Sequence, residues 1–451
     1  MLASRFDIMH NDASLFGELL TYDHCFIGFS GGLDSTALLF ACFKFLSQQK
    51  QTPVPSLTAI HINHQIDSAS DDWQAHCEDF CAKLGVAFIA KKITVEAGEK
   101  GLEAGARKAR YRAFVELISP ADGQSSALLL GHHAHDQAET LLLRLMRGSG
   151  LRGASAMSKS RTLGDSGTVL LRPLLAQSKS ELQQYVMSHK LEYLNDPSNQ
   201  DLRFDRNYIR HKILPSLLAR WPKAVEALTR FVDHLSADLE LLNDLAVIDL
   251  SFADRSEHSY GESLSLIHCR QLTVRRRSNL LRYWLLKNGL LMPSTILMDQ
   301  INGLITSSRV DAHIKIADCK LCVYRNRLYL IDSHKLNQLA QCLQAKHDWS
   351  LVKPLPVPAL FRLTAVQCSS SQRLLIEGDY WVSNRSHDSK VRYQGINRSL
   401  KNVFQKHGVP VWLRDSYPIV YSADRIAAIP GILVADDFVS SDGYLLNWSW
   451  S

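Results

Sequence analysis

Short apolar runs alternate with longer helix-like stretches through the first half of the chain. The apolar runs have the length and β-branched content of buried strands. They cover Cys25 to Phe29, Leu57 to Asn63, Val86 to Ile93 and Ala127 to Gly131, and the stretches between them include Ser70 to Leu84 and Glu103 to Ile118. This order predicts an α/β fold with a doubly wound parallel sheet, which binds ligands at the carboxyl ends of its strands.

The pattern changes after Trp221-Pro222. Before it, a strand is still predicted at Leu170 to Leu175 and a helix at Lys179 to His189. After it, the pattern is helical at Ala224 to Ser251 and at Leu280 to Thr306, with a polar loop between them. The stretch from His313 to Asp332 then alternates like a hairpin. A proline-rich join at residues 353–358 precedes short strand-like runs. We therefore expect a catalytic domain at residues 1–220, a mainly helical domain at 221–345 and a small α+β, β-rich domain at 350–451.

Length and composition agree with several domains. A chain of 451 residues is too long for one core. It has no apolar run long enough to span a bilayer and no signal-peptide pattern at its start, so we expect a cytoplasmic protein without a membrane partner. Nine cysteines without regular spacing do not form a disulfide framework pattern and favour reduced thiols.

The positive charge is concentrated rather than large. The net charge is only +6, but eight basic and three acidic residues lie between Arg385 and Arg425, among them Arg398, Lys401 and Arg414. A second group, which includes Arg275 and Arg276, lies beside Tyr283 and Trp284. Each group alone is equally well explained as a solvated face, but together they suggest a polyanionic partner, most simply a nucleic acid.

The turn after the first strand is typical of an anion-binding site. It places Ser30, Gly31, Gly32, Leu33, Asp34, Ser35 and Thr36 between a strand and an apolar helix. Adjacent glycines let backbone N–H groups approach phosphate oxygens, and the helix N-terminus adds partial positive charge. The final Lys of G-x-x-x-x-G-K-[ST] and the G-x-G-x-x-G fingerprint are both missing. The turn instead resembles the SGGxDS loop of the ATP pyrophosphatase (PP-loop) superfamily, whose members release pyrophosphate from ATP and adenylate a carbonyl oxygen.

A second constellation follows the strand at Ala127. The segment Gly131-His132-His133-Ala134-His135-Asp136-Gln137-Ala138-Glu139-Thr140 opens an apolar helix. Asp136 and Glu139 are three residues apart and share one helical face, at the same sheet edge as the glycine turn. Such a pair could hold Mg²⁺ or an ammonium group, or could simply be acids favoured at a helix N-terminus.

The motifs together resemble the tRNA(Ile)-lysidine synthetase family. In chain order they are the SGGxDS loop, His61 to His64, Glu103 to Tyr111, the His132 to Thr140 segment, Gly148 to Gly153, Arg172 to Leu175, Asp196 to Asn199 and Arg206 to Arg210. Asn397 to Asp415 resembles the family's C-terminal domain. Two departures stand out: His135 replaces the usual first Asp of an acidic pair, and Ile66-Asp67 replaces Leu-Arg.

The resemblance implies the reaction. ATP would adenylate the C2 oxygen of the wobble cytidine in an isoleucine tRNA with a CAU anticodon, and the ε-amine of free L-lysine would then displace AMP. Under this reading the glycine turn and His61 bind ATP, Asp34 and Asp136 contact Mg²⁺, and Asp136 and Glu139 bind and deprotonate lysine. Arg110 and Arg206 are candidates for the α-phosphate or the adenylate, or for structural ion pairs.

The resemblance also assigns the remaining partners. Arg275, Arg276, Arg398, Lys401 and Arg414 are the candidates for tRNA contacts. A homodimer is possible on this reading, and the sequence itself does not decide it.

Three other functions compete. A tRNA thiolase with the same loop would need paired cysteines, but Cys319 and Cys322 stand at an odd spacing in a strand-like run, which directs them to opposite faces. An amidotransferase normally needs a glutaminase unit, for which no nucleophilic Cys follows Met1. A non-catalytic tRNA-binding protein is the third, and His135 is the best argument for it.

Overall fold

The chain forms two compact units, Met1–Glu240 and Leu241–Ser451. The structure is a computed structural model, and it describes residues 16–50, 53–65, 69–94, 102–118, 123–164, 166–195, 200–258, 261–307, 313–351, 353, 355–357, 361–368, 373–375, 378–384, 390–440 and 443–450. Ile66-Asp67, the Asp196 to Asn199 motif and Arg385 lie outside these ranges. No described helix combines the length and the hydropathy needed to cross a membrane.

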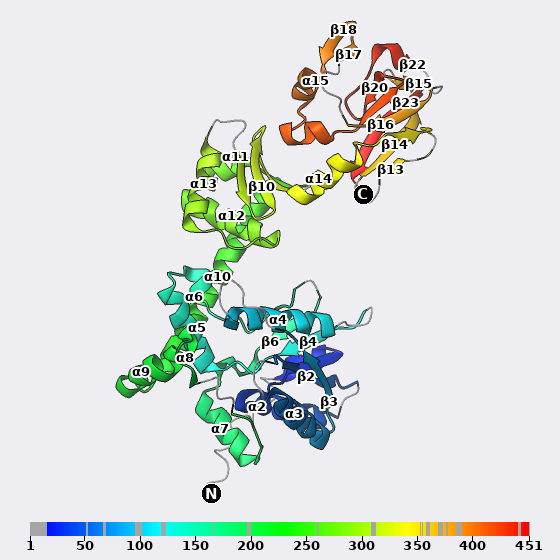
Figure 1. Ribbon diagram of the computed structural model, residues 1–451. Helices are drawn as coiled ribbons and strands as arrows, with labels where there is room; N and C mark the ends of the chain where they lie inside the picture. Colours follow the sequence, from blue (N-terminus) through cyan, green and yellow to red (C-terminus); the bar gives the residue numbers. More distant parts are fainter. Residues whose placement is uncertain are drawn as a thin grey trace. The chain divides into compact units, whose positions relative to one another are not determined.

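The first unit is the α/β half of the chain (Figure 1). Its strands are β1 (His24–Gly28), β2 (Ser56–Asn63), β3 (Ala87–Lys92), β4 (Ser126–Leu129), β5 (Ser160–Thr162) and β6 (Val169–Leu171). Its helices are α2 (Leu33–Ser47), α3 (Ser70–Leu84), α4 (Leu102–Leu117), α5 (Ala134–Met146), α6 (Leu151–Ala154), α7 (Lys179–Ser188), α8 (Asp205–Tyr208) and α9 (Leu214–Arg220), with a π-helical turn at Ile209–Ile213 and 3-10 turns at Gly17–Thr21 and Pro173–Ala176.

The six strands follow the order β3-β2-β1-β4-β6-β5. All neighbouring pairs are parallel except β5–β6. Alternate residues of β1 and β4 enter different cores: Ile27 and Leu129 pack with α2, α3 and α7, whereas Phe26 and Leu128 pack with α4. Figure 1 shows α2 and α3 on one side of the sheet and α4 on the other. The predicted doubly wound parallel sheet is confirmed, although Pro173 ends the last strand earlier than expected.

The second unit joins helices to antiparallel sheets. The helix α10 (Ala224–Phe252) runs across the division, and it is followed by α11 (Leu266–Gln271), α12 (Val274–Lys287), α13 (Thr295–Thr306), α14 (Ser333–Cys342) and α15 (Leu400–His407), with 3-10 turns at Val411–Ser416 and Asp436–Phe438. The strands are β7 (Ser256–His258), β8 (Gly261–Ser265), β9 (His313–Ile316), β10 (Cys319–Tyr324), β11 (Arg327–Asp332), β12 (His347–Trp349), β13 (Leu355–Val357), β14 (Phe361–Cys368), β15 (Arg373–Leu375), β16 (Tyr380–Ser383), β17 (Lys390–Tyr393), β18 (Ile396–Ser399), β19 (Ile419–Ser422), β20 (Arg425–Ile429), β21 (Leu433–Val434), β22 (Val439–Ser440) and β23 (Gly443–Trp450).

Two expectations for the second unit need correction. The polar stretch at 253–263 is not simply a loop, because β7 and β8 join β11, β10 and β9 in a five-stranded antiparallel sheet. Short strands with one solvated face carry little apolar signal, which is why the sequence pattern missed them. The continuous helix expected over Leu280 to Thr306 is two helices, α12 and α13, which pack with the sheet around Trp284.

Two further five-stranded sheets, β12-β16-β19-β20-β21 and β13-β14-β23-β15-β22, form the C-terminal part together with the β17–β18 hairpin and α15. One apolar cluster includes Tyr324 and Tyr329 as well as Phe404 and Trp349, so the C-terminal sheets share a core with β10 and β11. Three separate domains therefore stay a prediction.

Candidate active site

Hydrogen bonds between residues of the glycine turn stabilise its conformation. The Ser30 N–H donates to Ser35 Oγ at 3.2 Å, and the Ser35 hydroxyl donates to the Gly32 carbonyl at 3.0 Å. Gly32 is the N-cap of α2 and makes no side-chain cap hydrogen bond. The start of α2 thus has no side-chain cap, which suits the anion site predicted for this turn, although the Gly32 N–H itself donates to Ser30 Oγ at 3.4 Å.

Gly31 is required for both conformation and space. Its φ of +77° lies in the left-handed region. A Cβ at this position would lie 2.8 Å from Leu194 Cδ1 and 2.9 Å from Cys77 Sγ. Leu194 also donates its backbone N–H to the Gly31 carbonyl at 2.8 Å. A segment more than 160 residues downstream in the sequence thus fixes the shape of the turn.

The second constellation lies directly beside the turn. A Cβ at Gly131 would lie 2.9 Å from the Asp34 carbonyl oxygen, so the glycine permits close approach of β4 to α2. His133 Nε2 lies 3.5 Å from Asp34 Oδ1 and 3.6 Å from Asp136 Oδ2. The buried imidazole of His133 therefore stands between two predicted metal ligands.

Asp136 and Glu139 form a buried ion cluster with two arginines. Arg206 lies 2.6 Å from Asp136 Oδ1 and 2.7 Å from Glu139 Oε2, and Arg210 lies 3.2 Å from Asp136 Oδ1 and 2.6 Å from Glu139 Oε1. The other oxygen of Asp136 accepts the His133 backbone N–H at 3.0 Å and completes a capping box at the start of α5. Both carboxylates thus already hold cations.

Charge and burial set the protonation of this cluster. Burial raises the pKa of Asp136, but His133 and Arg206 outweigh it and hold that pKa below its usual range. Burial opposes charge on His133, but Asp136 and Asp34 outweigh it and raise the pKa of the imidazole. Asp136 is therefore a weak base, whereas the two carboxylates favour the charged form of His133.

Three further histidines, at the carboxyl ends of β2 and β4, favour the neutral form. His61 Nδ1–H donates to the Phe29 carbonyl at 2.9 Å, and burial lowers the pKa of His61. Burial, followed by the charges of Arg110 and His61, lowers the pKa of His64 to about 4. Burial lowers the pKa of His132 to about 3. Arg110 is exposed on α4. Its charge acts on His64, as does that of His61, the predicted ATP-binding residue.

Family models and relatives cover almost the whole chain. The model described as "PP-loop domain" matches residues 7–217, "TilS substrate binding domain" matches 264–329 and "TilS substrate C-terminal domain" matches 381–450. The tRNA(Ile)-lysidine synthase of Legionella pneumophila strain Paris is 34% identical, with 96% of each chain covered. The enzyme of the same name from Pseudomonas aeruginosa is 36% identical over 94% of this chain and 92% of its own length.

The chain belongs to the tRNA(Ile)-lysidine synthase family. A third relative of that name, from Coxiella burnetii, is 31% identical over 94% of this chain and 92% of its own. The resemblance inferred from the motifs is confirmed by this similarity, which extends over both units.

The departure at His135 has a structural explanation. Its Nδ1 accepts the Lys179 backbone N–H at 3.4 Å, at the start of α7, and its ring lies 5.7 Å from that of His133. Burial and the positive charge of His133 lower the pKa of His135. A neutral ring can accept a hydrogen bond from a helix N-terminus just as the Asp expected in the family would.

The donors fit Mg²⁺ at Asp34 better than at Asp136. The only interaction recorded for Asp34 Oδ1 among the described residues is the long ion pair with His133 Nε2 at 3.5 Å, whereas the two Asp136 oxygens accept shorter hydrogen bonds, of 2.6 and 3.0 Å. No group of three or more His, Cys, Asp or Glu side chains in the described ranges is arranged as a metal site. Mg²⁺ commonly binds one or two carboxylates together with substrate phosphates, which suits Asp34 beside the glycine turn.

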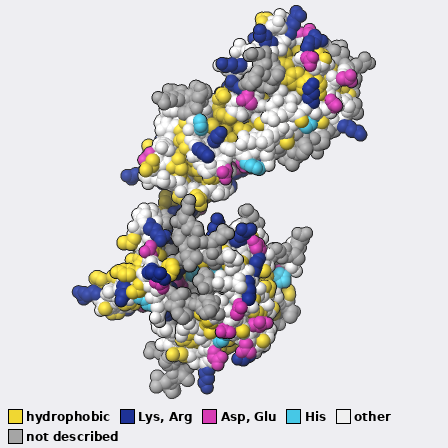
Figure 2. Space-filling view, viewed as in Figure 1, with side chains coloured by type: hydrophobic (Ala, Val, Ile, Leu, Met, Phe, Trp, Pro, Cys, Tyr) yellow, Lys and Arg dark blue, Asp and Glu magenta, His cyan; other side chains and the backbone are white. Residues whose placement is uncertain are grey.

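The predicted RNA contacts of the second unit differ in their surroundings. Arg276 pairs with the fully buried Asp249 at 2.8 Å, and Arg414 donates to the Val409 carbonyl at 3.0 Å. Arg275 and Lys401 are exposed, and Arg398 is half-buried. Figure 2 shows several Lys and Arg side chains over the region of β17 and β18. Arg276 is thus partly engaged in holding α12 to α10.

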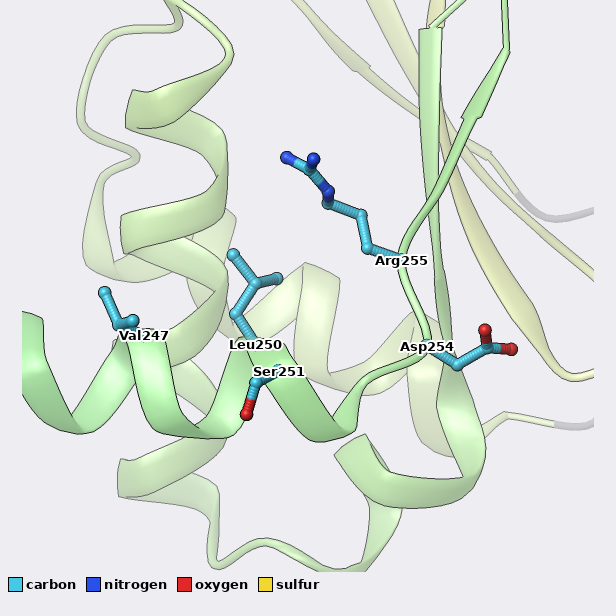
Figure 3. A pocket seen from close by; sticks show the side chains of 5 residues that line it. All are labelled: Val247, Leu250, Ser251, Asp254 and Arg255. Atoms are coloured by element: carbon cyan, nitrogen blue, oxygen red, sulfur yellow. The ribbon is translucent and has the colours of Figure 1, made fainter.

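A cavity of about 450 Å³ lies at the end of α10 in the second unit. Figure 3 shows its lining side chains, Val247, Leu250 and Ser251 from the helix and Asp254 and Arg255 from the segment after it. Arg255 lies 2.7 Å from Glu257, so the cation on its wall already has a partner. None of the predicted site residues lines this cavity.

The sequence missed His133, Arg210 and Leu194 as site residues. His133 and Arg210 stand inside quoted motifs, so motif position alone could have indicated them. Leu194 carries no chemical group that a motif search would select, and only its backbone bond to Gly31 identifies it.

Proposed function

We propose that this protein joins the ε-amine of free lysine to C2 of the wobble cytidine of isoleucine tRNA with a CAU anticodon, using ATP. AMP and pyrophosphate are released, and the codon read changes from AUG to AUA. The observation that carries the proposal is an SGGxDS turn beside His133, Asp34 and the Asp136–Glu139 cluster, in a chain similar over its full length to lysidine synthases. The enzyme is accordingly a ligase.

In the first step, the cytidine C2 oxygen attacks the α-phosphorus of ATP. The bond to the β-phosphate breaks and pyrophosphate leaves. The N–H groups of Gly31 and Leu33 and the hydroxyl of Ser30 would bind the negative charge of pyrophosphate. The Gly32 N–H and the Ser35 hydroxyl would join them by giving up their hydrogen bonds to Ser30 Oγ and to the Gly32 carbonyl. Mg²⁺ held by Asp34 would neutralise more of that charge when bound.

In the second step, the lysine ε-amine attacks C2 and AMP leaves. Lysine is protonated near neutral pH, with a pKa of about 10.4, and must lose a proton before it attacks. We assign the binding of the ammonium to Asp136 and Glu139, where guanidinium groups now lie. The same two carboxylates are our candidates for accepting its proton, with Glu139 the better of the two in base strength because His133 and Arg206 lower the pKa of Asp136.

Arg110 and Arg206 remain our candidates for the α-phosphate or the adenylate. Arg206 would have to leave at least one of its two carboxylates to reach a phosphate, and an arriving lysine ammonium could take its place. Arg275, Arg276, Arg398, Lys401 and Arg414 remain candidates for tRNA contacts. We propose a cytoplasmic location, where ATP and tRNA occur, and leave a homodimer as a prediction.

The test is incorporation of radiolabelled lysine into an isoleucine tRNA transcript with CAU, compared with the methionine tRNA that shares the anticodon. We expect ATP-dependent incorporation into the first only. Asp136→Asn should retain ATP binding and lose lysine transfer, and normal transfer by this variant contradicts its role.

Two other outcomes of this assay contradict the proposed function. Nucleotide binding without any pyrophosphate release in the presence of tRNA indicates a non-catalytic RNA-binding protein. Sulfur incorporation indicates a thiolase, although Cys319 and Cys322 pack into different apolar clusters, on opposite faces of β10.

A further inference from the structure

Two arginines of the first unit lie over one tyrosine ring. The guanidinium carbon of Arg107, from α4, lies 5.3 Å from the centre of the Tyr111 ring, and that of Arg161, from β5, lies 5.2 Å from it. Arg107 Nη2 also donates to the Tyr111 hydroxyl at 3.5 Å. Both arginines are exposed, so their remaining N–H donors face solvent.

The charge of a third arginine, Arg172, acts on the same tyrosine. Arg172 follows β6 and is only 4% exposed. Its Nη1 donates to the Ser158 carbonyl at 2.8 Å, but its buried Nε has no hydrogen-bond partner among the described residues. A buried charged donor without an acceptor is costly, and a ligand or ordered water usually satisfies it.

No described carboxylate neutralises these three arginines. Arg112 on the same helix pairs with Glu116, and Arg206 pairs with Asp136 and Glu139, but no ion pair links Arg107, Arg161 or Arg172 to a carboxylate whose side chain the structure describes. Burial raises the pKa of Tyr111, yet the charges of Arg107, Arg172 and Arg161 outweigh it and lower that pKa. The local potential therefore favours an anion.

The cluster lies close to the glycine-turn edge of the sheet. β4 and β6 are neighbouring parallel strands, and the Leu130 N–H donates to the Leu171 carbonyl at 3.0 Å. His132 follows β4 just as Arg172 follows β6, and the charges of Arg172 and Arg107 both act on His132. A ligand on the arginines would thus be adjacent to the reacting groups.

We propose that Arg107, Arg161, Arg172 and Tyr111 bind a backbone phosphate of the RNA, beside the nucleotide that reacts. The inference rests on the proposed function. The glycine turn has its own N–H donors for the phosphates of ATP, whereas RNA brings a phosphate on each side of any base presented to that turn. Guanidinium groups suit phosphate because they donate two parallel hydrogen bonds.

The test uses the full-length protein with Arg107→Gln and Arg161→Gln, singly and together, because both side chains are exposed and their loss should not unfold the protein. Binding of isoleucine tRNA is measured over a range of salt concentrations, together with the KM for ATP. We expect the double variant to bind tRNA about tenfold more weakly, with its salt slope smaller by about 0.7, the value for one lost contact to single-stranded RNA. The KM for ATP should change less than about twofold.

Arg112→Gln is the matched control, since it removes an arginine of α4 that already has a partner, and it should leave the slope unchanged. Tyr111→Phe should weaken tRNA binding less than the double variant. An unchanged salt slope in the double variant overturns the proposal, and a raised KM for ATP with unchanged tRNA binding assigns the cluster to the nucleotide instead. Failure of the wild-type protein to incorporate lysine counts against the proposed function, whereas these binding results test the cluster itself.

Discussion

The first unit and the C-terminal basic segment use charge in opposite ways. Beside the glycine turn, Asp136 and Glu139 are buried and bind Arg206 and Arg210 at 2.6 to 3.2 Å. In the segment at 390–425, Lys401 is exposed and Arg425 pairs with the exposed Asp437. The first set of charges fixes side chains relative to one another. The second set creates a positive electrostatic potential that attracts a polyanion.

The difference teaches what each kind of charge can contribute. A buried pair is hardly screened by salt, so removing one partner leaves an uncompensated charge in a poorly solvated place. An exposed charge contributes little until it meets a phosphate, and its effect then depends on ionic strength. Four substitutions test this contrast, from the largest expected effect to the smallest.

Glu139→Gln should be the most damaging. The Glu139 side chain is 1% exposed and binds two guanidinium groups, so the amide should lower the free energy of unfolding by about 3 kcal/mol and abolish lysine transfer. Denaturant titration measures the loss. Glu226→Gln, at an exposed position of α10, is the control and should change stability by less than about 0.5 kcal/mol. If Glu139→Gln and Glu226→Gln lowered the free energy of unfolding by similar amounts, solvent would be screening the Asp136–Glu139 cluster.

Gly31→Ala should impair turnover more than Gly32→Ala does. Position 31 has φ +77° and no room for a Cβ, whereas at Gly32 the nearest atom to a Cβ would be Ser30 Oγ at 3.5 Å. Backbone strain of about 1 to 3 kcal/mol predicts a loss of kcat/KM at position 31 of roughly fivefold to a hundredfold. Steady-state pyrophosphate release measures it, and equal losses at the two positions would show that left-handed geometry is not what the turn needs.

Lys401→Gln should leave stability unchanged and weaken tRNA binding. The salt slope of binding should fall by about 1 if Lys401 contacts a phosphate. Arg425→Gln is the control from the same segment, because its charge is already shared with Asp437. Substitution is preferable to deleting residues 350–451, since Tyr324 and Tyr329 share their core with that region and would be exposed by deletion. An unchanged slope would remove Lys401 from the interface.

The smallest effect concerns acid stability. In the folded state the pKa of His64 is about 4, so the ring stays neutral between pH 6.5 and 4. In the unfolded chain the same ring binds a proton in that window. The free energy of unfolding therefore falls as the pH falls from 6.5 to 4. His133 acts in the opposite sense: its raised pKa stabilises the fold below pH 6.5, and this contribution is lost as the pH rises through that pKa.

His64→Gln should therefore flatten the loss of stability on acidification. The measurement is the urea midpoint at pH 7 and pH 5. His334→Gln, at an exposed position of the second unit, is the control. An identical pH dependence in the wild type and in His64→Gln would show that His64 accepts a proton in the folded state.

Local patterns predicted the parts of the fold whose signals are local. The range predicted for α3 agrees at both ends with the helix observed, because its apolar face and the glycine after it are both visible in the sequence. The strands β7 and β8 were missed because the pairing of β8 with β11, more than sixty residues away, decides their conformation, and β7 pairs only with β8. The Asp136–Glu139 face was predicted, but its partners were not.

By itself, the sequence determined a strand, a glycine turn and a helix whose N-terminus suits an anion, since these elements follow from adjacent residues and from the freedom of Gly31. The final shape of the turn also depends on the backbone of Leu194. It also determined the family, because the motifs occur in a fixed order. Only the tertiary structure decided that Arg206 and Arg210, 67 to 74 residues away, occupy the carboxylates, and that His133 stands between Asp34 and Asp136. Charge–charge interactions depend on distance and burial, and neither quantity is set by position along the chain.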